Sequence, residues 1–264
     1  MDAMTGHTAA GRRIAGEGTP DGDWQAWDGL RNLPPVSAAT LVPPCRRAVI
    51  VAPHPDDEVL ACGGLLQLLA AQGSTTLLVA VTDGTASHPG STSMTPEHLA
   101  RLRPGETGAA LRALGLGVSP ATPAPCVLRV RLPDGAVAAS AGQLQTLLEL
   151  MLRPDDVVFV TWRQDGHPDH EACGLAAAMA ASGCGATLIE MPVWSWHWAA
   201  PGDVRVPWHR AHRLVLSEDV LRRKREAVRC FTSQLHEDTT TGQPAILPPH
   251  VLARLLHPYE IYFT

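Results

Sequence analysis

The chain has 264 residues, of which 45% are hydrophobic, and a formal net charge of −5. This length suits one large domain with a substantial core, and no apolar run reaches the ~18 residues that a membrane helix requires. The small negative charge comes without a basic cluster, which argues against a nucleic-acid partner.

The first 45 residues are rich in Gly, Pro, Thr and Ala, with Trp24 and Trp27 as their only large anchors. Proline biases the residue before it away from helix, so we expect residues 1–45 to form an extended, partly flexible lead-in to a single catalytic domain over 46–264. The lead-in lacks the apolar stretch of a secretory signal. The six cysteines are scattered and form no C-x-x-C pair, so a reducing cytoplasm is the expected location.

After the lead-in, short apolar runs rich in β-branched residues alternate with amphipathic or apolar helical segments. The predicted strands are residues 47–52, 75–84, 126–135, 156–162, 186–194 and 213–217. The predicted helices are residues 58–73, 96–114, 141–152, 169–182 and 218–231. Pro104 and Gly105 are expected to break the second of these helices into two pieces.

This alternation predicts an α/β chain with a Rossmann-like three-layer fold and a mostly parallel sheet. In such sheets ligands bind beyond the carboxyl ends of the strands. The tetrapeptides "HPDD" (54–57) and "HPDH" (167–170) both follow predicted strands. We therefore expect both to lie at the same edge, where the active site should be.

The two tetrapeptides together hold the donors of a metal site. A catalytic zinc site needs three nitrogen or oxygen ligands and an open position for water. His54 and Asp57 flank a fixed proline, and His170 comes from the second loop. Asp56 stands beside Asp57 and is a candidate general base towards a metal-bound water. The pattern predicts a His–Asp–His site with its own base.

The remaining residues of the second tetrapeptide have candidate roles as well. His167 could present a donor to a developing oxyanion, and Asp169 could orient one of the imidazoles. The alternative is that the acidic residues cap helices, since Asp57 and Glu58 suit a first helical turn and Asp169 suits an N-cap. Capping does not account for His54.

The ordered pair "PHPDDE" and "HPDH" resembles the LmbE-like, or PIG-L, family of zinc-dependent de-N-acetylases. The resemblance covers roughly residues 47–235 and extends to "VTDGTASH" (81–88), "RPGE" (103–106), "LPDG" (132–135) and "KREAVRCFTSQ" (224–234). It implies one Zn²⁺ per chain, with other divalent metals such as Fe²⁺ as alternatives. It also implies an N-acylated small molecule, sugar-containing in some members, as the substrate.

The resemblance assigns roles by position. It implies metal binding by His54, Asp57 and His170, a general base at Asp56, stabilisation of the tetrahedral intermediate by His167, and substrate binding by Arg103. The setting of Arg103 departs from the family, because Pro104-Gly105 follows it. Some sugar-processing members have a tyrosine two residues before "HPDH", where this chain has Asp165, so a sugar substrate does not follow automatically.

A Trp-rich segment over residues 192–212 lies after the fifth predicted strand. Aromatic faces stack on sugar rings or acyl chains, so Trp196 and His197 are candidate substrate-binding residues. The equal alternative is that the tryptophans finish a buried strand and His197 is a hydrogen-bonded structural histidine.

The leading hypothesis is a zinc-dependent N-deacetylase acting on an amino sugar or related small conjugate. One alternative is a dinuclear metal phosphoesterase, which would need further ligands, and only Asp56, Asp165 and Asp169 remain to supply them. Another is a non-catalytic ligand-binding protein on the same fold, although no G-x-G-x-x-G follows a strand. We expect no nucleic-acid or membrane partner, and a homo-oligomer stays open.

Overall fold

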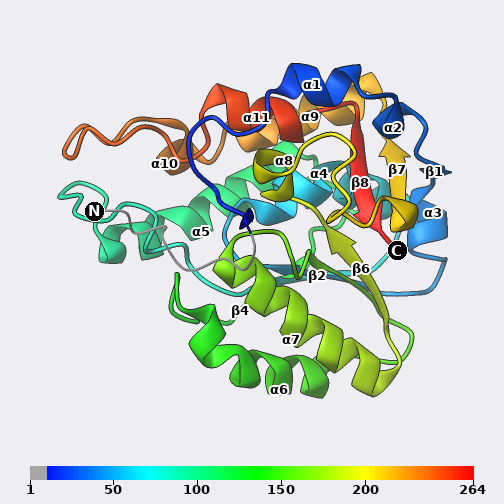
Figure 1. Cartoon of the computed structure of the whole chain (residues 1–264). Coiled ribbons are helices and arrows are strands. Elements are labelled where there is room, and N and C mark those ends of the chain that lie inside the picture. The colour runs from blue at the N-terminus through cyan, green and yellow to red at the C-terminus, as the bar shows by residue number, and fades with distance from the viewer. Residues whose placement is uncertain (1–10) are drawn as a thin grey trace.

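The computed structural model describes residues 11–264, and its centre is an eight-stranded sheet with the order β1-β7-β8-β6-β5-β2-β3-β4 (Figure 1). The strands are β1 (Pro35–Val36), β2 (Ala48–Ala52), β3 (Thr76–Ala80), β4 (Cys126–Arg129), β5 (Val157–Thr161), β6 (Thr187–Met191), β7 (Ala211–Val215) and β8 (Tyr259–Phe263). β8 runs antiparallel to β6 and β7, and the other neighbouring pairs are parallel. The predicted mostly parallel sheet is confirmed.

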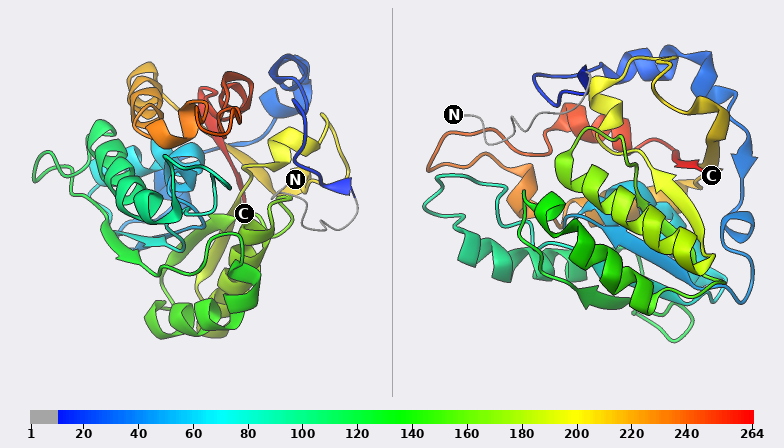
Figure 2. Two further views of the ribbon diagram at one scale, coloured as in Figure 1. Left: turned by 90° about the vertical axis from the view of Figure 1, so that its left-hand side faces the viewer. Right: turned by 60° about the horizontal axis from the view of Figure 1, so that its bottom comes forward.

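Helices cover both faces of this sheet. They are α1 (Asp21–Ala26), α2 (Asp28–Arg31), α3 (Ala38–Leu41), α4 (Asp57–Ala71), α5 (Pro96–Ala113), α6 (Ala141–Met151), α7 (Pro168–Cys184), α8 (Ser195–Trp198), α9 (Glu218–Val228), α10 (Thr232–Leu235) and α11 (Pro249–Leu255), with 3₁₀ helices η2 (Val137–Ser140) and η3 (Trp208–Arg210). In Figure 1, α6 and α7 lie below the sheet and α4, α9 and α11 above it, and Figure 2 shows the layers from two further sides.

The central strands explain how two cores form. Successive side chains of a strand point to opposite faces. Val49 and Val51 of β2 therefore join the core beneath α6 and α7, whereas Ile50 joins the core beneath α4 and α9. All residues of β2 and β5 are buried, as a strand covered by helices on both sides requires. The predicted three-layer architecture is confirmed.

The position of the site follows from the pairing of β2 with β5. The two strands are parallel neighbours, with Val51 opposite Val160. Their carboxyl ends therefore meet at one edge, and the chain segments that leave them begin side by side. The first segment leads into α4 and the second into α7.

The predicted break at Pro104 is wrong, because α5 continues from Pro96 through Ala113 with this proline inside it. Proline removes one helical hydrogen bond and crowds the preceding turn, at a cost of about 3 kcal/mol. Contacts of the buried Arg103 hold the turn before it: the guanidinium donates to the carbonyls of Gly84 and Pro55 and to the Asp56 carboxylate. These tertiary bonds offset the local penalty.

Residues 11–45 contain α1, α2, α3 and the edge strand β1, where the sequence predicted an extended lead-in. Trp24 is 1% exposed. Its ring packs edge-on against Trp196 at 5.0 Å between centroids, and its indole N–H donates to the Trp196 carbonyl. The segment is therefore packed against the rest of the domain through the buried Trp24. Residues 1–10, the rest of the predicted lead-in, lie outside the described residues.

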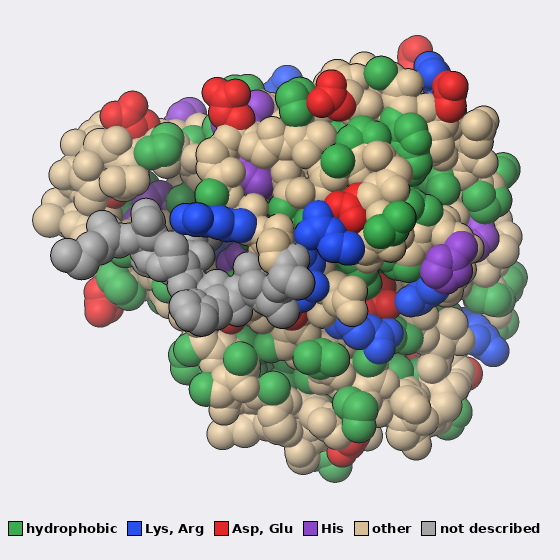
Figure 3. Space-filling model, viewed as in Figure 1, with side chains coloured by type: hydrophobic (Ala, Val, Ile, Leu, Met, Phe, Trp, Pro, Cys, Tyr) green, Lys and Arg blue, Asp and Glu red, His purple; other side chains and the backbone are tan. Residues whose placement is uncertain are grey.

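Positive and negative side chains are interspersed on the face that Figure 3 shows. Among the described residues, Arg163 and Arg210 both form ion pairs with Glu190. Across residues 11–264, the structure contains no helix with the length and apolar character needed to cross a membrane.

Candidate metal centre and active site

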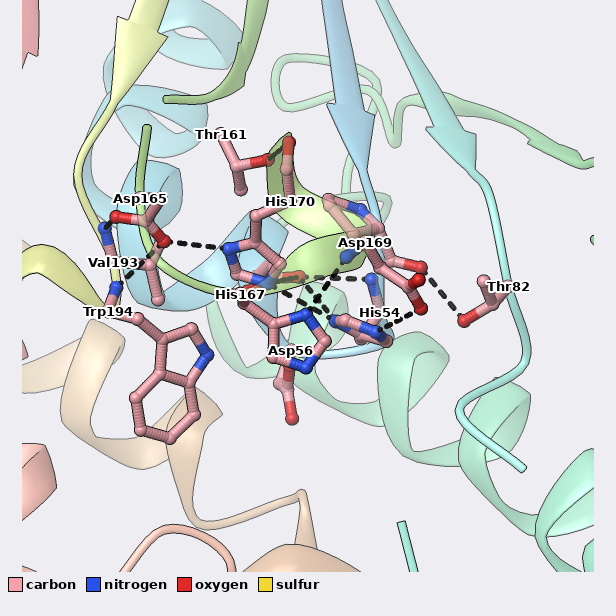
Figure 4. Close-up of polar contacts among 12 residues, drawn as sticks. His54, Asp56, Thr82, Thr161, Asp165, His167, Asp169, His170, Val193 and Trp194 are labelled. Atoms are coloured by element: carbon pink, nitrogen blue, oxygen red, sulfur yellow. Dashed lines mark hydrogen bonds and ion pairs between the residues drawn. The ribbon is translucent and has the colours of Figure 1, made fainter. Parts of the chain in front are cut away.

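Two loops build the candidate site, one after β2 and one after β5 (Figure 4). The first carries His54 and Asp56 and leads into α4, whose first residue is Asp57. The second carries Asp165 and His167, the N-cap of α7, whose first turn holds His170. The loops lie more than a hundred residues apart in the chain, and the structure brings together the two tetrapeptides as the sequence predicted.

Three donor atoms converge between these loops. His54 Nδ1 lies 3.2 Å from Asp57 Oδ2 and 3.3 Å from His170 Nε2, and the last two atoms lie 3.2 Å apart. In a tetrahedral zinc site, metal–ligand distances of about 2.0–2.1 Å place the ligand atoms about 3.3 Å from one another. The three atoms thus form a triangle of the size that a tetrahedral ion requires, so the donor set fits a divalent metal.

The other nitrogen of His54 faces carboxylates. His54 Nε2 lies 3.2 Å from Asp134 Oδ1 and 3.3 Å from Asp169 Oδ2. Asp169 in turn accepts the backbone N–H groups of Gly135 and Val137. Burial lowers the pKa of His54, but the hydrogen bonds that its ring donates to Asp134, Asp169 and Asp57 raise this pKa overall to well above its usual value. The carboxylates fix the ring so that Nδ1 faces the triangle.

His170 has a comparable partner in Asp165. Its Nδ1 lies 2.8 Å from Asp165 Oδ2, so Nε2 is the nitrogen that faces the triangle. Burial lowers the pKa of His170, and the charges of Asp57 and Asp165 outweigh this effect and raise it to about 9. The same two histidines act on Asp57: although burial raises its pKa, they lower it far below the usual value.

Asp56 is buried beside the triangle and pairs with Arg103. Arg103 Nη2 lies 2.9 Å from Asp56 Oδ2. Burial raises the pKa of Asp56 to about 8, against the lowering effect of the Arg103 charge. The backbone of Asp56 has φ +134°, a conformation that is costly for a non-glycine residue and is concentrated at functional sites. Its N–H donates to Glu58 Oε2 at 3.0 Å, which holds this conformation.

His167 lies next to both histidines of the triangle, with its ring centroid 4.8 Å from each. The backbone N–H of Asp169 donates to His167 Nδ1 at 3.2 Å. A ring nitrogen that accepts a hydrogen bond carries no proton, so in the neutral imidazole Nε2 is the donor. Burial, together with the positive charges of His54 and His170, lowers the pKa of His167 to about 3.

Three predicted substrate-binding residues have buried polar partners. Arg103, 2% exposed, faces Asp56 as described. Trp196 donates its indole N–H to the Pro192 carbonyl. His197 contacts the Ala15 carbonyl through Nε2 and Arg254 through Nδ1. Trp196 and His197 thus join α8 to the N-terminal segment.

Sequence reasoning missed two of the orienting acids. Asp134 belongs to the "LPDG" turn after β4, and its second oxygen accepts the Ala86 N–H. The sequence identified Asp165 only as the residue that replaces a tyrosine and as a possible ligand of a second metal ion. Its partners, the N–H groups of residues 193–195, lie about thirty residues further along the chain, so only the "DG" turn composition before "HPDH" could have drawn attention to it.

Comparison with known proteins gives one family match and a set of similar structures. The family model described as GlcNAc-PI de-N-acetylase (PIG-L) matches residues 49–181, a span that contains both loops. No curated protein matches the chain.

Among solved structures, an N,N'-diacetylchitobiose deacetylase from Pyrococcus horikoshii has a TM-score of 0.54 at 20% identity over 72% of this chain and 71% of that one. The zinc-inhibited form of the teicoplanin deacetylase Orf2 has a TM-score of 0.53 at 22% identity over 72% and 85%. GalB from Pseudomonas putida KT2440, a 4-carboxy-2-hydroxymuconate hydratase, has a TM-score of 0.51 at 18% identity over 72% and 80%. At these identities the likeness shows a shared fold.

Proposed function

The chain belongs to the PIG-L family of de-N-acetylases, and from this premise we propose that it is a metal-dependent hydrolase that removes an N-acyl group, chiefly acetyl, from an amino sugar or related small conjugate. The observation that carries the proposal is the triangle of His54 Nδ1, Asp57 Oδ2 and His170 Nε2, with sides of 3.2–3.3 Å. An acid and a neutral imidazole stand next to it.

The triangle would hold one metal ion per chain. Three nitrogen or oxygen donors with an open fourth position are typical of catalytic zinc sites, and Fe²⁺ is the alternative for imidazole and carboxylate ligands. When bound, the ion supplies Lewis acidity towards the carbonyl oxygen and lowers the pKa of water. Asp57 and His170 are buried, whereas the His54 side chain is 14% exposed.

Asp56 is the proposed general base. Arg103 binds its Oδ2, which leaves Oδ1 to take a proton from the attacking water and later to return it to the leaving amine nitrogen. Its raised pKa of about 8 describes the metal-free site and suits a carboxyl that must hold this proton between the two transfers. Arg103 supports the charged form of the base and sets its orientation.

His167 is the proposed donor to the oxyanion. As a neutral imidazole with Nδ1 already accepting the Asp169 N–H, it presents Nε2–H as a fixed donor. Such a preorganised donor stabilises negative charge that develops on the carbonyl oxygen, an effect worth about 3–4 kcal/mol per donor in well-studied hydrolases. Asp169 also binds His54, so its proposed role is to orient rather than to react.

The substrate class is supported by the family and by the names of similar structures, which include an N,N'-diacetylchitobiose deacetylase and a teicoplanin deacetylase. The hydratase GalB has the same fold, so the fold alone does not select amide hydrolysis. A dinuclear phosphoesterase is disfavoured, because the oxygens of Asp165 and Asp169 already accept backbone N–H groups and would have to give up these bonds to bind a second ion.

The experiment is an amine-release assay of the zinc-loaded protein across N-acetylated amino sugars and acyl-amine conjugates. Wild-type protein should release amine, and Asp56→Asn should lower turnover by about 10²–10⁴-fold while keeping one metal per chain. Asp155→Asn, at an exposed aspartate on the opposite edge of the sheet, is the control and should behave like wild type. Metal-loaded protein that releases no amine from any of these compounds, or an Asp56→Asn variant with wild-type rates, would overturn the proposal.

A further inference from the structure

Asp165 is a fully buried carboxylate, 0% exposed, that touches a candidate metal ligand without belonging to the ligand set. We propose that Asp165 is a positioning residue that fixes His170 in the tautomer and orientation needed for metal binding and ties this ligand to the turn at residues 193–195. The inference rests on the metal site of the proposed function, and it concerns a residue to which neither the family resemblance nor the comparisons give a role.

The hydrogen bonds of Asp165 determine the tautomer of His170. Its Oδ1 accepts the backbone N–H groups of Val193 at 2.9 Å and Ser195 at 3.0 Å. Its Oδ2 accepts the N–H of Trp194 at 2.9 Å and contacts His170 Nδ1 at 2.8 Å. A backbone N–H can only donate, so the carboxylate acts as an acceptor throughout. In the metal-binding form of His170 the proton is therefore on Nδ1, and the Nε2 lone pair faces the triangle.

The carboxylate itself is held in place from both sides of its backbone. The N–H of Asp165 donates to the Trp162 carbonyl at 3.0 Å, and the Asp165 carbonyl accepts the Trp198 indole N–H at 2.6 Å. The next residue, Gly166, has φ +99° and no room for a Cβ beside the Trp198 ring. These contacts restrict the backbone conformation around Asp165, and in this conformation its carboxylate faces His170.

His170 is also fixed at its own backbone, because Thr161 Oγ1 donates to its carbonyl at 3.1 Å. With the backbone held by β5 and the ring held by Asp165, rotation of the imidazole away from Asp57 would break the 2.8 Å contact. Carboxylates that accept the second N–H of a ligand histidine typically strengthen metal binding about 10–100-fold. Asp165 therefore preorganises the site before the ion arrives.

The same carboxylate joins the metal site to the Trp-bearing turn. Figure 4 shows Asp165 between His170 on one side and the backbone of Val193 and Trp194 on the other. The half-buried Trp194 indole extends from this turn on the same side of the histidines as Asp56. A single side chain thus contacts both the proposed ligand His170 and the backbone that carries the Trp194 indole.

The competing explanation is that Asp165 only stabilises the turn, and a matched variant separates the two. Asp156 is also 0% exposed and precedes β5 at the opposite edge, where it pairs with Arg47 at 2.6 Å. Zn²⁺ affinity is measured by competition with a chelator, alongside thermal unfolding, for Asp165→Asn and Asp156→Asn. Both should lower Tm, but only Asp165→Asn should weaken Zn²⁺ binding, by about 10–100-fold. A folded Asp165→Asn variant with wild-type Zn²⁺ affinity would overturn the inference.

A second measurement needs no substitution at Asp165. Long-range ¹H–¹⁵N spectra of the zinc-loaded wild-type protein, with His170 assigned through His170→Gln, report which ring nitrogen carries the proton. The inference predicts the proton on Nδ1 and the metal on Nε2, and the reverse arrangement refutes it. Failure of the wild-type chain to bind Zn²⁺ would overturn the proposed metal site as well, whereas Zn²⁺ binding that ignores Asp165 would refute only this inference.

Discussion

Gly84→Ala tests whether the Arg103–Asp56 pair is as closely packed as the structure has it. Gly84 has φ +64°, and a Cβ at this position would overlap Nη1 and Cζ of Arg103 and approach Nε to 3.0 Å. The guanidinium is 2% exposed and cannot swing into solvent without breaking its contacts. The added methyl group must therefore displace Arg103 from Asp56.

The expected cost has two parts. Alanine in the left-handed region costs about 1–2 kcal/mol. Moving Arg103 breaks its bonds to Gly84 O at 3.0 Å, Pro55 O at 2.6 Å and Asp56 Oδ2 at 2.9 Å. At a pH above the pKa of Asp56, about 8, it also leaves a buried carboxylate without its cation. Breaking a buried ion pair from one side costs about 3–5 kcal/mol. The free energy of unfolding should therefore fall by about 4–7 kcal/mol, a large share of the stability of a typical domain.

Gly90→Ala is the matched control, because Gly90 has φ +80° and open space where its Cβ would lie. Gly90→Ala should lower the free energy of unfolding by only the cost of alanine in the left-handed region, about 1–2 kcal/mol. Equilibrium unfolding in urea gives both values, and the difference between the variants isolates the clash with Arg103. Gly84→Ala should also lose turnover in the amine-release assay, whereas Gly90→Ala should keep it. Equal loss of stability in the two variants would show that Arg103 is not held where the structure has it.

Three further outcomes are expected. Trp24→Ala should lower the free energy of unfolding by about 3–5 kcal/mol, because its ring is 1% exposed among other tryptophans; a change below about 1 kcal/mol in urea unfolding would mean that the N-terminal segment does not pack there. Lys224→Met should lower the free energy of unfolding by about 3–5 kcal/mol, since it leaves Glu260, 2.7 Å away, buried without its cation. The double variant with Glu260→Gln should recover part of this loss. Fully additive losses in the double variant would contradict the pairing. Zn²⁺ binding near pH 7 should release protons and strengthen as the pH rises. The reason is that the pKa values of His54 and His170 are raised in the metal-free chain, whereas metal ligands must be deprotonated. Calorimetry in buffers of different ionisation enthalpy measures the proton release, and proton uptake would contradict this prediction.

The sequence was sufficient to predict the fold class and the meeting of the two tetrapeptides. Continuous apolar runs such as β2 and β5 identify buried parallel strands, and the carboxyl ends of such strands share an edge. The placement of both tetrapeptides at one edge follows from these two rules. Their side-by-side position also requires β2 to pair with β5, a neighbour relation that the sequence did not predict.

The parts that the sequence did not predict depend on contacts between distant segments. β8 lies between β6 and β7, and such an antiparallel insertion leaves no local signal. The continuity of α5 through Pro104 depends on bonds from Arg103 to residues 55, 56 and 84. Asp165 contacts His170 and also accepts N–H groups of a turn about thirty residues away, so these contacts become visible only once β6 is paired with β5.

The most direct test of the account is a crystal structure of the zinc-soaked protein with anomalous data collected at the zinc edge. The account predicts one anomalous peak per chain, about 2.0–2.1 Å from His54 Nδ1, Asp57 Oδ2 and His170 Nε2. A peak elsewhere, two peaks sharing the site, or a fully occupied ion that lacks His170 as a ligand would contradict it.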